Sequence, residues 1–197
     1  GSIVEITQSS VEVLTEPSNE DWYTVIPVTS EKIAGMSDEE IFNYLKANND
    51  FLLKEYKTQG YRQRKFTMLH PDTDYTVVWF GYHGGTMTTP MSKESFRTIA
   101  SGDPQECTFE FAVQPEEEEA WVEVTPSDKG HFYYWIVCPA YYTEEEFKGF
   151  LEEEVIKGSY EGNYKSFVSW ELAQGDAATT VSGLFSGTDY KVGVVIL

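Results

Sequence analysis

A short stretch that occurs twice in this chain of 197 residues constrains its fold more than any other feature. Residues 69–79 read Leu-His-Pro-Asp-Thr-Asp-Tyr-Thr-Val-Val-Trp, and residues 184–194 read Leu-Phe-Ser-Gly-Thr-Asp-Tyr-Lys-Val-Gly-Val. Each copy consists of a leucine, a turn, the tripeptide Thr-Asp-Tyr and an apolar strand. A repeat of this kind predicts that one folding unit is used twice.

The elements that precede each copy arrive in the same order. Strands predicted over 3–7, 11–13 and 22–28 in the first half correspond to strands over 109–113, 121–124 and 132–138 in the second. A capping box then follows in each half, Ser37 with Glu40 and Thr143 with Glu146, so each half is expected to start a helix there. We predict helical insertions over about 37–59, broken near 48–50, and over about 143–174. A strand is predicted over 65–69, after the first insertion. The domains are predicted to be 1–100 and 101–197, a size at which a β-sandwich folds alone.

The strand after the first copy is apolar on both of its faces. Side chains alternate along a strand, so Tyr75, Val77 and Trp79 share one face while Val78, Phe80 and Tyr82 share the other. A sandwich strand with one face in water should alternate with polar residues, which means that something covers the second face. We therefore predict a mainly β fold of two tandem sandwiches, each with its helical insertion covering one outer sheet face.

The second unit is expected to lack its last strand. The first unit continues after Tyr82 with a turn at 83–85 and a strand over 86–98 that is interrupted at Pro90, whereas the second stops at Leu197, the counterpart of Tyr82. An apolar strand left at a sheet edge favours pairing with another strand. Two explanations stay open: the natural chain runs on, which we favour, or a neighbour donates the strand.

The repeated motif resembles the sixth-strand signature of fibronectin type III domains, which have an immunoglobulin-like fold. Its first copy supplies Leu69, Pro71, Thr73, Tyr75 and Val77, and its second supplies Leu184, Thr188, Tyr190 and Val192 with Ser186 in place of the proline. The resemblance implies that Leu69, Tyr75, Leu184 and Tyr190 are structural and that no catalytic residues are carried over. The helical insertions depart from the ordinary members of the family.

The chain as a whole is also similar to cell-surface lipoproteins of gut-dwelling bacteria, which are described as adhesion or glycan-handling accessory proteins. This resemblance implies a secreted or cell-surface location, periplasmic or anchored to the outer membrane. It leaves room for a lipid anchor in the full-length chain.

The charge of the chain excludes two classes of partner. Thirty-three acidic residues against 14 basic ones give a formal charge of −19, which repels nucleic acid and anionic membrane surfaces. No apolar run approaches the roughly 20 residues of a membrane span. The acidic run at 116–119 is interpreted as a solvated loop.

No metal, cofactor or catalytic site is predicted. His70, His83 and His131 fall at expected turns or strand starts and share no ligand spacing, so we interpret them as exposed loop residues. Asp72 and Asp74 are too few carboxylates for calcium. Cys107 and Cys138 fit no zinc or redox spacing, and we favour two buried thiols over a disulfide. A hydrolase with a pair of carboxylates in a deep pocket is the third-ranked function, because nothing singles out such a pair.

Aromatic residues near turns are the candidate ligand site. Tyr82 beside His83, and the pair Tyr141 and Tyr142, would stack on sugar rings or anchor a protein partner; the alternative is that they pack under the helices. The leading hypothesis is a monomeric, non-catalytic extracellular or cell-surface binding or adhesion module that recognises protein or glycan. The alternative is a structural spacer or pilus-like subunit completed by a strand from a partner.

Overall fold

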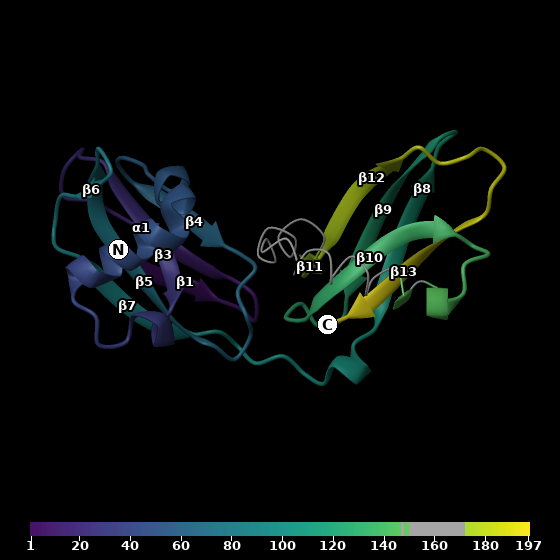
Figure 1. The fold of residues 1–197 in the computed structure, drawn as a ribbon, viewed down its shortest axis with the longest axis horizontal. Helices are drawn as coiled ribbons and strands as arrows, with labels where there is room; N and C mark the ends of the chain where they lie inside the picture. Colours follow the sequence, from purple (N-terminus) through teal and green to yellow (C-terminus); the bar gives the residue numbers. More distant parts are fainter. Residues whose placement is uncertain (147, 150–171) are drawn as a thin grey trace. The chain divides into compact units, whose positions relative to one another are not determined.

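The computed structural model describes residues 1–146, 148–149 and 172–197, and strands dominate it (Figure 1). The prediction of a mainly β protein is confirmed. The chain divides into two compact units, Gly1–Ala100 and Ser101–Leu197, and each is described by itself.

Unit 1 contains two sheets and a helix. Its strands are β1 Ser2–Ile6, β2 Val11–Thr15, β3 Tyr23–Thr29, β4 Arg62–Phe66, β5 Asp74–His83, β6 Thr86–Met87 and β7 Ser92–Arg97. The first sheet has the order β1-β2-β4, and in the second β5 pairs with β3, β6 and β7, all antiparallel. A short 3-10 helix, η1 Ser30–Ile33, precedes helix α1 Asp38–Glu55.

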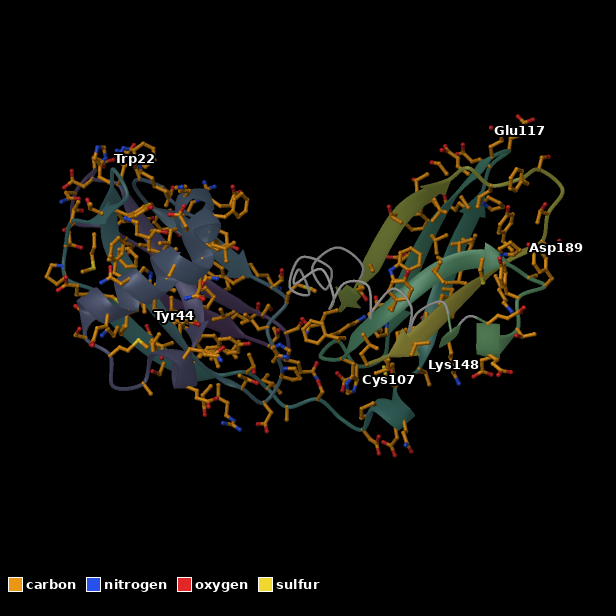
Figure 2. All side chains as sticks on the ribbon, viewed as in Figure 1. Trp22, Tyr44, Cys107, Glu117, Lys148 and Asp189 are labelled. Carbon is orange, nitrogen blue, oxygen red and sulfur yellow. The ribbon has the colours of Figure 1, made fainter. Side chains whose placement is uncertain are left out.

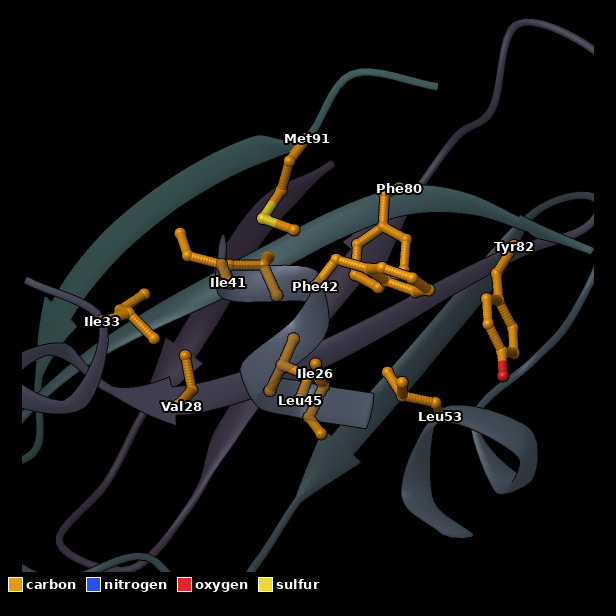
Figure 3. Close-up of a cluster of buried hydrophobic side chains, with 11 residues drawn as sticks. Ile26, Val28, Ile33, Ile41, Phe42, Leu45, Leu53, Phe80, Tyr82 and Met91 are labelled. Carbon is orange, nitrogen blue, oxygen red and sulfur yellow. The ribbon is translucent and has the colours of Figure 1, made fainter. Parts of the chain in front are cut away.

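Strand β5 divides its side chains between two apolar layers. Tyr75, Val77 and Trp79 are buried against Val11, Val13 and Phe66 of the first sheet. Val78, Phe80 and Tyr82 on the opposite face are buried with Ile41, Phe42, Leu45 and Leu53 of α1 (Figure 3). Both faces of this sheet are therefore shielded from water, one by the other sheet and one by the helix.

Helix α1 starts and kinks where the sequence indicates. The Glu40 N–H donates to Ser37 Oγ at 3.4 Å, and the Ser37 N–H donates to Glu40 Oε2 at 2.8 Å, so the capping box is complete. Asn49, with φ of −140°, lies in the expected break. The helix ends at Glu55, short of the predicted residue 59, because Thr58 forms a two-way backbone bridge with Tyr23 at 2.9 and 3.0 Å.

Two predicted strands of unit 1 are corrected. The strand predicted over 65–69 is β4, which ends at Phe66 because Met68 adopts a positive φ of 61° that breaks the extended backbone. The strand predicted over 86–98 is two strands, β6 and β7, separated by the segment that contains Pro90.

Unit 2 also contains two sheets. Its strands are β8 Phe109–Pro115, β9 Glu119–Pro126, β10 Phe132–Pro139, β11 Leu172–Gln174, β12 Ala177–Ser182 and β13 Tyr190–Ile196, and a 3-10 helix, η2 Pro104–Glu106, precedes them. The sheets have the orders β12-β9-β8 and β11-β10-β13. Their shared cluster buries Ala120, Val122, Val124 and Tyr133, with half-buried neighbours that include Val192 and Val194.

The second helical insertion is described in part. Its capping box is present, with the Thr143 N–H donating to Glu146 Oε2 at 2.7 Å and the Glu146 N–H donating to Thr143 Oγ1 at 3.2 Å. Most of the predicted range 143–174 lies outside the described residues. Its end is wrong, because Leu172–Gln174 pairs with β10 as a strand and directs Ala173 to the core.

Each unit contains an equivalent hydrogen bond from a tyrosine to a glycine carbonyl, which the sequence pattern does not predict. The hydroxyl of Tyr23 donates to the Gly60 carbonyl at 2.9 Å, and that of Tyr133 donates to the Gly175 carbonyl at 2.7 Å. Both glycines have positive φ, 65° and 71°, which only glycine adopts without strain. Burial, with Asp176 nearby, raises the pKa of Tyr133 to about 12, so its hydroxyl remains a donor at neutral pH.

Candidate functional site

Each copy of the repeated motif forms a tyrosine corner. Tyr75 Oη accepts a hydrogen bond from the His70 N–H at 2.9 Å, and Tyr190 Oη accepts one from the Phe185 N–H at 2.9 Å. In antiparallel sandwiches such a tyrosine ties the turn to the strand that follows it. Tyr75 is buried, whereas Tyr190 is half-buried.

Removing the two corner hydroxyls is expected to have unequal effects. Tyr75→Phe should destabilise unit 1 by about 0.5–1.5 kcal/mol, because it removes the part-buried hydrogen bond from the His70 N–H to the Tyr75 hydroxyl. Tyr190→Phe should cost less, since water reaches that half-buried hydroxyl. Urea unfolding, followed through NMR signals of each unit, measures both changes. Equal losses in the two units would contradict this expectation.

The residues proposed for ligand binding belong to different units and differ in exposure. Tyr82 is only 2% exposed and lies under α1, with its ring centroid 6.3 Å from those of Phe42 and Phe80. It cannot stack on a ligand, so its proposed binding role is wrong and the alternative of packing under the helix holds. His83 is exposed at the end of β5, and Tyr141 and Tyr142 belong to unit 2.

The pair Tyr141 and Tyr142 forms an exposed aromatic surface. Their rings are stacked, with centroids 5.0 Å apart and an interplanar angle of 25°, and they are 75% and 40% exposed. The backbone beneath them is fixed by hydrogen bonds from the Tyr142 N–H to the Pro139 carbonyl at 3.1 Å and from the Ala140 N–H to the Asp189 carbonyl at 2.8 Å. Lys191 Nζ also donates to the Tyr142 carbonyl. Desolvation and the neighbouring Tyr142 raise the pKa of Tyr141.

A groove of about 450 Å³ opens at the end of unit 2 where β13 begins. Its apolar wall includes Val113, Val122 and Val192, and Tyr190 lies at one side. Glu116, Glu117 and Asp189 supply an acidic rim. Figure 2 shows Glu117 at the tip of the β8–β9 hairpin and Asp189 in the turn before β13. No residue pattern in the sequence predicts this groove.

The carboxylates of the first motif are already paired. Arg97 donates through Nε to Asp72 Oδ1 at 2.9 Å and through a terminal nitrogen to Asp74 Oδ2 at 2.7 Å. The Arg97 guanidinium lowers the pKa of Asp72 by hydrogen bonding and by its charge. The two aspartates therefore hold the end of β7.

Other titratable groups differ in part from expectation. His131 is buried rather than exposed, because it packs beside Asp128, with the His131 Nε2 and Asp128 Oδ2 atoms 3.6 Å apart. Cys138 is a buried free thiol, but Cys107 is only half-buried. Among the residues that the structure describes, no three His, Cys, Asp or Glu side chains are grouped to hold a metal ion. Within the same residues, no helix has the length and apolar character to cross a membrane.

Comparison with known proteins does not assign a family. No protein-family model and no curated protein matches the chain. Among solved structures, the chain is similar to a two fibronectin type-III domain segment from chicken tenascin, with 13% identity and a TM-score of 0.30. The alignment covers 100% of this chain and 88% of that one. A TM-score of this size carries no argument, so the fold and function of the units rest on their own geometry.

Proposed function

We propose that the protein is a non-catalytic binding module that recognises a protein or a glycan through Tyr141 and Tyr142. The stacked, exposed pair is the observation that carries this proposal. Flat aromatic rings held by a fixed backbone bind sugar faces or apolar side chains at little conformational cost. The acidic surface would favour partners that are neutral or basic.

The proposal includes the architecture and the setting of this module. We propose that each unit is a fibronectin type III-like sandwich with a helical insertion. Two features that occur in both units support this. One is the tyrosine corner, and the other is the hydrogen bond from Tyr23 or Tyr133 to a glycine carbonyl. The resemblance further favours a secreted or cell-surface protein with adhesive function. We propose that this protein is a monomer, and light scattering at several concentrations tests its oligomeric state.

Alanine at either tyrosine of the pair is expected to weaken recognition. A glycan and protein array identifies the ligand, and Tyr141→Ala and Tyr142→Ala should each weaken binding about tenfold or more, as central aromatic anchors do. Tyr61→Ala is the matched control, because Tyr61 is an exposed tyrosine of unit 1. Circular dichroism should show an unchanged fold in all three variants. No array binding, or equal binding by all variants, overturns the proposal.

A structural subunit completed by a partner's strand is the second candidate function. Strand β5 is paired on both sides, with β3 and with β7. Among the described residues of unit 2, the corresponding strand β13 pairs with β10 alone. An unpaired edge of this kind is a template for an added strand.

A further inference from the structure

In unit 1, three successive residues at the end of β7 pack beside the corner tyrosine, Tyr75. Phe96 of β7 is buried and stacks on Tyr75, with ring centroids 5.5 Å apart and an interplanar angle of 18°. The next residue, Arg97, binds two aspartates of the motif. Thr98 Oγ1 then donates to the His70 carbonyl at 2.7 Å and accepts from the Thr73 N–H at 3.0 Å. An aromatic, a basic and a hydroxyl residue in succession thus close this end of unit 1.

The same position in unit 2 is open in the part of the chain that the structure describes. The strand registers align the two sites, since Tyr75 lies opposite Thr29 of β3 and Tyr190 lies opposite Pro139 of β10. Val192 is half-buried, whereas its counterpart Val77 is fully buried. The corner ring of Tyr190 lines the groove.

The inner face of β8 confirms that this end is underfilled. Phe111 and Val113 lie opposite Val124 and Val122, so they share the face that packs into the core. Val122 and Val124 are buried, yet Phe111 and Val113 are 47% and 49% exposed. Ile3, which lies opposite the buried Val13 in unit 1, is half-buried. Apolar side chains on the core-facing side of a strand that remain exposed to water indicate a surface for binding another segment.

The groove also selects the charge of its occupant. Asp189 stands at the position of Asp74, which Arg97 binds in unit 1, and Gly187 replaces Asp72. Glu116 and Glu117 add to the acidic lining, and Lys191, the one basic residue among the described residues of that lining, already donates to the Tyr142 carbonyl. A basic side chain is therefore matched at the place where unit 1 carries Arg97. A second copy of this chain, with its formal charge of −19, is poorly matched.

We propose that the edge of β13 that pairs with no described strand binds an extended peptide strand that carries an aromatic, a basic and a hydroxyl residue in succession. The strand adds antiparallel to β13 by backbone hydrogen bonds. Its aromatic ring stacks on Tyr190 and covers Val192, its basic group meets Asp189, and its hydroxyl reaches the backbone of the turn at 185–188. This inference rests on the second candidate function and names the chemistry of the partner.

A synthetic peptide copied from unit 1 tests the proposal on the full chain. The probe spans residues 91–99, Met-Ser-Lys-Glu-Ser-Phe-Arg-Thr-Ile, and its controls are the Phe96→Ala peptide, the Arg97→Glu peptide and a scrambled peptide of the same composition. Amide hydrogen exchange at residues 190–196 is the readout, because it separates pairing at β13 from exchange with the native β7 of unit 1. The unsubstituted 91–99 peptide, the native peptide, should protect these amides and bind about tenfold more tightly than either singly substituted peptide.

The outcomes separate the inference from the function on which it rests. Protection by the native peptide that the two substitutions weaken supports the proposal, and Asp189→Asn in the protein should remove the preference for Arg97 over Glu. Equal protection by the scrambled peptide overturns the proposed chemistry and leaves a strand-completed subunit standing. No protection by any peptide overturns both. Concentration-dependent self-association that protects β13 without peptide also overturns the proposal, since the occupant is then a second copy.

Discussion

Leu45→Ala is expected to lower the free energy of unfolding of unit 1 by about 2–5 kcal/mol. Leu45 is fully buried in the layer between α1 and the β3–β5 face, beside Ile26, Phe42 and Leu53 (Figure 3). The substitution removes buried methyl groups and leaves a cavity that the neighbouring aromatic rings cannot fill without leaving their rotamers. Urea unfolding monitored through unit 1 measures the loss.

Asn43→Ala is the matched control for this substitution. Asn43 lies on the exposed side of α1, and alanine favours a helix more than asparagine does, so its stability should be unchanged or slightly higher. A loss of less than about 1 kcal/mol for Leu45→Ala would mean that α1 does not shield the sheet. Equal losses for the two variants would show that burial of the side chain at position 45 does not decide the effect.

The apolar character of β5 was the strongest guide to this layer. Period-two alternation alone assigned Tyr75, Val77 and Trp79 to one face and Val78, Phe80 and Tyr82 to the other, and the structure buries them in two separate clusters. A strand with two apolar faces needs two covers, so the sequence predicted that the helical section lies on the sheet. A strong alternating pattern of this kind predicts the fold well because all of its residues favour the same orientation of the strand.

Long-range partners were what the sequence could not supply. Asp72 and Asp74 were judged too few carboxylates for calcium, but the partner that they do bind was not predicted. Arg97, which binds both, follows more than 20 residues later on another strand. Tyr82 stands next to a Gly-Gly turn, a position typical of exposed aromatics, but it is buried by α1. Leu172 fitted a helical spacing, yet it lies in strand β11, which pairs with β10. In each case tertiary contact overrides the local pattern.

The candidate groove was hidden for a related reason. Val113, Tyr190 and Glu117 come from three separate segments, and their common surface exists because a strand that unit 1 has is absent beside β13 in the described residues. Only the comparison of one unit with the other shows that the groove corresponds to the place of Phe96. The repeated motif lets unit 1 serve as the reference for unit 2.

Phe96→Ala is expected to destabilise unit 1 by about 3–5 kcal/mol, which is the usual loss for a buried phenylalanine. Phe96 is buried against Tyr75, and its removal should leave that ring and Val77 as accessible as Tyr190 and Val192 are in unit 2. Amide exchange across residues 74–79 should then accelerate, while exchange in unit 2 stays the same. Glu94→Ala is the matched control, because Glu94 is exposed on the same strand opposite Val77 and should change stability by less than about 0.5 kcal/mol. A loss for Phe96→Ala no larger than that of Glu94→Ala would show that the stacked ring contributes little, and the site beside Tyr190 would then have no reason to select an aromatic residue.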